Sequence, residues 1–131
     1  MYEGDYKDDE RTGRGVYRWA DGAVYEGGYL EAKKHGLGWM KWVDGDSYYG
    51  EWSNNVFQGF GFHRYKNGGV HVGQYRDGVK EGDGVYFYPD GNRHQGPWKG
   101  DNKHGVGVFT YAGKKEKTLY ENDVVKQVQE T

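Results

Sequence analysis

The sequence predicts an all-β protein: an elongated single-layer antiparallel β-sheet solenoid, twisted and curved, built from β-hairpin repeats. The first observation is a step of 23 residues, without insertion, between the glycines Gly4, Gly27, Gly50, Gly73 and Gly96. The second is that paired glycines keep this step from Gly13/Gly15 to Gly105/Gly107. We therefore expect five 23-residue repeats, at 2–24, 25–47, 48–70, 71–93 and 94–117, and a short C-terminal cap at 118–131.

The first segment of each repeat reads Tyr-x-Gly-x-Tyr/Trp, as in Tyr25, Gly27 and Tyr29. If Tyr25 is position one of its repeat, the second segment alternates at positions twelve, fourteen, sixteen and eighteen, ending at Trp42. Alternation with period two is a strand signal, so each repeat is expected to be a pair of strands. Polar loops are expected inside the repeats, at Lys7–Thr12, Leu30–His35, Ser53–Gln58, Arg76–Glu81 and Lys99–His104.

The turns between repeats contain Asp-Gly or Asn-Gly, as in Val43-Asp44-Gly45 and Pro89-Asp90-Gly91. A two-residue turn would place the two sets of aromatic residues on opposite faces. A three-residue loop, a type I turn followed by a left-handed Gly, places them on one face and accepts Pro at its first central position. We therefore expect the three-residue loop, with Trp52 lying between Gly36 and Gly59.

The last repeat is irregular, because Gly113-Lys114-Lys115-Glu116-Lys117 replaces the turn. Residues 118–122 resemble a shifted strand opening. Asn122 or Asp123 is then expected to cap a short helix that carries Val124, Val125 and Val128. The first strand has no such cover and is expected to be an exposed edge.

Composition narrows the function classes. The chain has a net charge of -2 and 18% aromatic residues, so the aromatic side chains are expected to form the core. The near-neutral net charge argues against nucleic-acid binding, because nucleic-acid-binding proteins usually carry a surplus of basic residues. The absence of cysteine excludes a disulfide framework and thiolate metal sites. No apolar run reaches the roughly 18 residues of a membrane span, and no room precedes Tyr2 for a signal peptide, so we expect a soluble cytoplasmic protein.

These residues resemble MORN (membrane occupation and recognition nexus) repeats, whose consensus is Tyr-x-Gly-x-Trp, then Gly-x-Gly and an Asp-Gly turn. The resemblance covers residues 2 to about 114. It implies a curved antiparallel sheet that serves as a scaffold or partner-binding module, as in axonemal proteins, junctophilins, phosphoinositide kinases and a myosin-binding adaptor. The sequence departs from the family at His71 and His94, where an aromatic residue is preferred, and at Pro97, which is expected to weaken strand pairing.

Two surfaces are candidate partner-binding sites. On the face of the repeat motif, which also supplies the core through position five, the candidates are Tyr25, Trp42, Tyr48, Tyr65, His71, Tyr86, Tyr88 and His94. Alternation places a second apolar set on the opposite, outer face, namely Leu37, Trp39, Phe60, Phe62, Val85 and Phe87. An exposed apolar patch usually marks an interaction site. The alternative is that the C-terminal segment covers this outer set.

No cofactor, metal site or catalytic residue is expected. The repeated carboxylates, such as Asp21 and Asp44, are turn residues. Gly36-Leu37-Gly38 opens a strand and precedes no helix, so it is not a phosphate-binding loop. His63 and His71 are expected to lie opposite each other, but structural zinc takes four ligands and no third one is expected there.

Three functions follow, and the first is a non-catalytic protein–protein interaction or structural scaffold module. The resemblance places it in a cytoskeletal or ciliary (axonemal) assembly, with cytoskeletal, axonemal or motor proteins as partners, and self-association through the N-terminal edge or the outer patch is a further expectation. The second is a membrane or phosphoinositide-binding module. It is disfavoured because the loops Lys7–Thr12, Leu30–His35 and Arg76–Glu81 sum to -1, +1 and zero. The third is an accessory domain of a kinase or methyltransferase.

Overall fold

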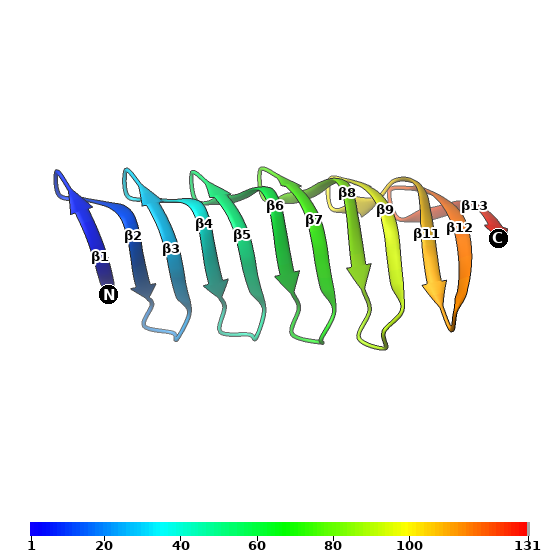
Figure 1. The fold of residues 1–131 in the computed structure, drawn as a ribbon, viewed down its shortest axis with the longest axis horizontal. Coiled ribbons are helices and arrows are strands. Elements are labelled where there is room, and N and C mark those ends of the chain that lie inside the picture. The colour runs from blue at the N-terminus through cyan, green and yellow to red at the C-terminus, as the bar shows by residue number, and fades with distance from the viewer. Residues whose placement is uncertain (131) are drawn as a thin grey trace.

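In the computed structural model, the backbone of residues 1–130 and the side chains of residues 1–126 are described. Thirteen strands form one antiparallel sheet whose order follows the chain, except that β10 pairs only with β9 (Figure 1). The strands are β1 (Tyr2–Lys7), β2 (Glu10–Arg18), β3 (Val24–Leu30), β4 (Lys33–Lys41), β5 (Ser47–Ser53), β6 (Val56–Arg64), β7 (Val70–Arg76), β8 (Val79–Phe87), β9 (Arg93–Lys99), β10 (Asn102–Lys103), β11 (Gly105–Tyr111), β12 (Lys114–Glu121) and β13 (Val124–Glu130). The predicted all-β, single-layer architecture is confirmed.

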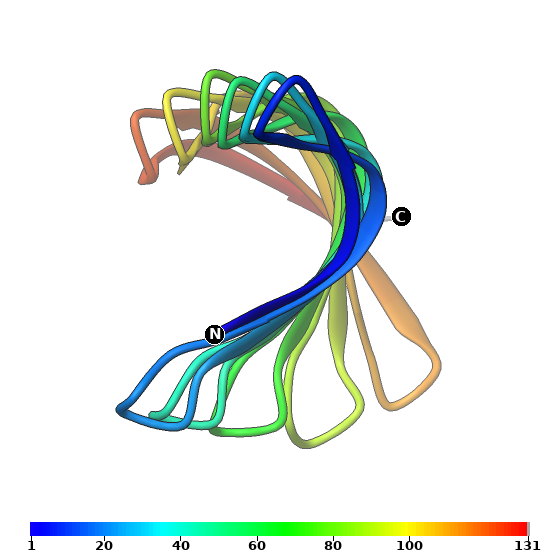
Figure 2. The ribbon, with the colours of Figure 1, turned by 90° about the vertical axis from the view of Figure 1, so that its left-hand side faces the viewer.

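The strands bend, so the sheet has a C-shaped cross-section when viewed along its length (Figure 2). Turns between repeats form one rim and turns within repeats form the other. Among the described residues there is no helix, and therefore none that could cross a membrane.

The turns between repeats are the predicted three-residue loops. The Trp42 N–H donates to the Asp46 carbonyl at 2.9 Å, and the Gly45 N–H donates to the Trp42 carbonyl at 3.2 Å. Gly45 has a φ of 104°, a conformation that favours glycine. Met40 consequently pairs with Tyr48, which keeps both aromatic sets on one face.

The turns within repeats differ from the prediction. They are two-residue turns in which both central residues have positive φ, as at Glu31 (50°) and Ala32 (66°). This is the type I′ geometry, whose twist matches that of a hairpin. The segments predicted as longer loops therefore belong mostly to strands, and Leu30 pairs directly with Lys33.

A β-bulge inside each of the first four repeats corrects the predicted register. Trp52 lies across from Gly36 on β4 as expected, but on β6 it faces Phe57 and not Gly59. The bulge places Gly59 at a φ of 86°, and the Glu51 carboxylate accepts the Phe60 N–H at 2.6 Å. These contacts stabilise the extra residues, so the prediction that Trp52 lies across from Gly59 was wrong.

The core is formed by rings lying over glycines on the concave, inner face. Position-five rings are buried as predicted at Tyr29, Trp52, Tyr75 and Trp98, but Tyr6 in the edge strand is 60% exposed. The rings that lie over the glycines, however, belong to position one and not to position five. A Cβ atom at Gly38 would overlap the Tyr25 ring, and a Cβ atom at Gly61 would overlap the Tyr48 ring. Glycine is required at these positions because the ring occupies the space of a side chain.

Pairing is weakened near Pro97 within the fifth repeat, as predicted, but not between the fourth and fifth repeats. Three residue pairs join β9 to β11 and two join it to β10, whereas six join β7 to β8. The β8–β9 ladder keeps six pairs, with Pro97 across from Asp83. The second segment of the fifth repeat is split into β10 and β11, and the His104 N–H between them donates to the Pro97 carbonyl.

The predicted C-terminal helix is wrong, because β12 and β13 form a sixth hairpin. Asn122 and Asp123 have φ angles of 50° and 68° and make a type I′ turn instead of a helix cap. Tyr120 pairs with Gly105 and packs its ring 5.2 Å from that of His94, as a position-five aromatic would. The backbone of Val128 pairs with that of Thr118, while the Val128 side chain lies outside the described residues.

Candidate functional site

The position-one residues of the inner face are not accessible to a partner. Tyr25, Tyr48, His71 and His94 are at most 1% exposed. The prediction that these four residues contact a partner is wrong. The sheet curves around them, and the facing glycines allow their rings to pack directly against the backbone. The other inner-face candidates are half-buried: Trp42, Tyr65, Tyr86 and Tyr88.

Side chains at position ten of the repeat cover these rings on the inner face. The Lys34 ammonium lies 5.2 Å from the Trp19 ring, and that of Lys80 lies 5.3 Å from the Tyr65 ring. Phe57 covers Trp42 in the same way, with ring centroids 5.9 Å apart. Burial lowers the pKa of Lys34 and of Lys80. Residues from the two ends of the strands therefore meet across the concave side and form a core there.

His63 and His71 pair across β6 and β7, as predicted. His63 Nε2 lies 3.5 Å from an Asp46 carboxylate oxygen, and burial lowers the pKa of His63 more than Asp46 raises it. Across the described residues, no group of three or more His, Asp or Glu side chains is arranged to hold a metal ion.

The outer face carries an apolar row that crosses five strands, which we call the outer row. Its members are directly paired in the order Trp39, Tyr49, Phe62, Val72 and Val85. Trp39 is 42% exposed, Tyr49 53% and Phe62 44%. These three side chains surround a hollow of about 350 Å³ with Ser47 and Arg64. The outer row is thus an exposed apolar surface of the kind that interactions use.

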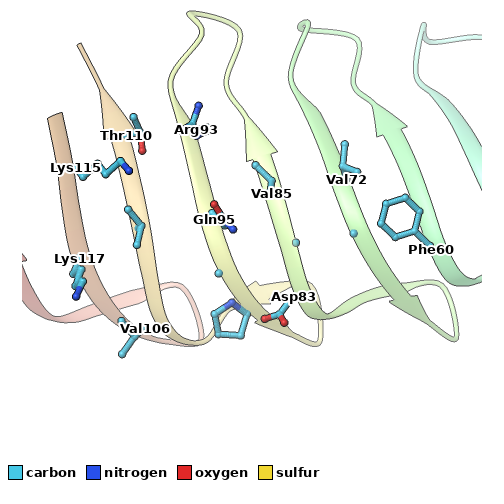
Figure 3. Close-up of a pocket in the computed structure, with 15 residues that line it drawn as sticks. Phe60, Val72, Asp83, Val85, Arg93, Gln95, Val106, Thr110, Lys115 and Lys117 are labelled. Carbon is cyan, nitrogen blue, oxygen red and sulfur yellow. The ribbon is translucent and has the colours of Figure 1, made fainter. Parts of the chain in front are cut away.

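A second hollow continues the outer row toward the C-terminal repeats. It has a volume of about 840 Å³ (Figure 3). Val72, Val85 and Gln95 line its middle, with Arg93 on one side and Asp83 on the other.

The predicted outer-face residues lie where alternation places them. Leu37, Trp39, Phe60, Phe62 and Phe87 are exposed, and Val85 is half-buried. Their role in partner binding stays a prediction. The C-terminal segment does not cover them, because β13 extends the sheet beside β12.

Sequence reasoning missed Tyr49 and Val72. Both follow a position-one residue directly, so the same alternation that directs Tyr48 and His71 inward directs them outward.

Comparison with known proteins agrees with this architecture. The model of the family described as MORN repeat matches residues 2–24, 25–47, 48–70, 71–93 and 94–114. A search of curated proteins found no match. Repeats of this family are generally modules that interact with proteins or membranes. Because the matched residues span the five hairpins whose glycines carry the buried rings, the chain belongs to the MORN repeat family.

Proposed function

We propose that this protein is a non-catalytic scaffold that binds a protein partner on its outer face, within a cytoskeletal or ciliary assembly. The observation that carries the proposal is the outer row, in which three neighbouring aromatic side chains are exposed and no described element covers them. Exposed aromatic side chains that cluster around a hollow are typical anchors of protein interfaces. The cytoskeletal setting is supported by the occurrence of similar arrays in axonemal proteins.

Replacing two ring anchors tests this function. We expect Trp39→Ala combined with Phe62→Ala to remove captured proteins in pull-downs from a lysate of ciliated cells, while circular dichroism stays unchanged. Val43→Ala is the matched control, since Val43 is an exposed apolar residue in a turn outside the outer row. Capture that is unchanged by the double substitution would exclude the outer row as the binding surface.

Membrane binding is the second candidate, because exposed basic residues accompany the aromatic rings. Arg64 lies at the hollow formed by Trp39, Tyr49 and Phe62. Sedimentation with vesicles of phosphatidylcholine and phosphatidylserine measures this activity. Strong sedimentation of the chain, lost on raising salt, would support the membrane function instead.

A further inference from the structure

A row of cations runs beside the outer row. It contains four exposed cations, Arg18, Lys41, Arg64 and Arg93, and three apolar residues and a serine lie between them. The strand pairing runs in the order Arg18–Val24–Lys41–Ser47–Arg64–Val70–Phe87–Arg93. Lys41 is two residues after Trp39, and Arg64 is two residues after Phe62. Two residues along a strand span about 6.7 Å on one face, so Lys41 and Arg64 flank Trp39 and Phe62 at side-chain reach.

These four cations have no acidic partner in the part of the chain that the structure describes. The ion pairs found there join His63 to Asp46 and Lys126 to Glu121. Lys41 instead places its ammonium 4.2 Å from the centroid of the Trp39 ring.

The opposite flank of the outer row carries two carboxylates among exposed apolar residues such as Leu37 and Phe60. Glu51 lies two residues after Tyr49, and Asp83 lies two residues before Val85. The outer face therefore carries cations along one flank of its apolar centre, and carboxylates on the other flank at β5 and β8.

The spacing of the anchors favours a helix as the ligand. Neighbouring strands are about 4.8 Å apart, so an element laid along the outer row meets one anchor at each such step. Successive turns of an α-helix are 5.4 Å apart, close to this step. Side chains on one face of an extended strand are about 6.7 Å apart. A bound strand would therefore fall out of step with the anchors of the outer row after two of them.

We propose that the outer row binds an amphipathic helix of a partner protein, one that carries acidic residues along the flank facing Lys41, Arg64 and Arg93. This rests on the proposed function and specifies the chemistry of the partner. The helix places one apolar side chain per turn on the row from Trp39 to Val85, and its acidic flank pairs with the cations. Glu51 and Asp83 repel the same helix in the reversed lateral orientation, which fixes how it lies.

An anionic membrane fits this face less well. A bilayer surface would contact the acidic flank as well as the basic one, so Glu51 and Asp83 would oppose binding. A bilayer is also too flat to fill the hollow of about 840 Å³ around Val72 and Val85, whereas a helix presents a convex ridge.

Two stapled helical peptides of about 14 residues, long enough to cross five strands, test the proposal. Both carry leucine on one face; one has glutamate along a single flank and the other has lysine there. By fluorescence anisotropy with the full chain, we expect the glutamate peptide to bind about tenfold more tightly than the lysine peptide. The variant Arg64→Glu with Arg93→Glu should reverse this preference, and Arg76→Glu with Lys99→Glu, the same charge change at the rim, should keep it.

Equal binding of the two peptides, or a preference that survives Arg64→Glu with Arg93→Glu, overturns the proposal. So does sedimentation of the chain with phosphatidylserine vesicles when neither peptide binds. The lysate pull-down distinguishes failure of the scaffold function from failure of the acidic-helix proposal. If Trp39→Ala with Phe62→Ala removes capture and Arg64→Glu with Arg93→Glu does not, the scaffold function stands and the acidic-helix proposal is wrong. If neither double variant changes capture, the scaffold function on this face fails.

Discussion

At the scale of single residues, two histidines replace the core tyrosines. The Tyr25 and Tyr48 hydroxyls donate to the carbonyls of Gly28 and Glu51. His71, in contrast, has no hydrogen-bond partner for either ring nitrogen among the described residues. Burial, with a smaller contribution from Lys80, lowers the pKa of His71 to about 3, and burial lowers that of His94 to about 4.

These pKa values predict that the fold loses stability in mild acid. Between about pH 6.5 and pH 4 the unfolded chain binds more protons than the folded chain, so the free energy of unfolding falls by about 1.4 kcal/mol per pH unit for each histidine. We expect His71→Tyr to reduce the loss between pH 7 and pH 5 by about 2 kcal/mol, measured by urea unfolding. His35→Tyr, at an exposed position, is the control. A wild-type stability that is equal at the two pH values would contradict the prediction.

At the scale of elements, the turns within repeats are the places where backbone strain is stored. Ala32 has a φ of 66°, whereas the equivalent residue two repeats later, Gly78, has a φ of 86° and nearly open space around its α-carbon. Each left-handed residue other than glycine costs about 1 kcal/mol.

Ala32→Gly should therefore raise the free energy of unfolding by about 1 kcal/mol, and Gly78→Ala should lower it by a similar amount. The Ala32 N–H to Arg11 carbonyl bond, 3.0 Å long, needs no side chain and is retained. Chemical unfolding of the pair measures both effects. Changes of the same sign in the two variants would show that φ strain does not control these turns.

At the scale of the whole molecule, each strand hydrogen-bonds only to the strands beside it in the sheet, and core rings reach one strand further, as from Tyr25 to Trp52 at 5.4 Å. Stability in such an array is the sum of local terms, and end units lack one neighbour. We expect hydrogen exchange to be slowest in β4–β7 and fastest in β1 and β13, measured by mass spectrometry of proteolytic fragments. Equal protection of all strands would indicate a single cooperative unit instead.

The sequence alone determined the hairpin repeat, the turn between repeats and the face on which Trp39, Phe62 and Trp52 lie. These follow from period-two alternation and from Asp-Gly turns, which act over a few residues. It also indicated that pairing would be weakened near Pro97, which holds between β9 and β11 but not between β8 and β9.

Only the tertiary structure decided which residues meet across strands and which remain exposed. The bulge at Gly59 resets the register, so Trp52 faces Phe57, and Tyr48 covers Gly61. The curvature of the sheet then buries His71 and leaves Tyr65 half-buried, although alternation places both on the inner face. Pairing between strands and curvature depend on contacts between residues distant in the chain, and alternation within one strand carries no information about them.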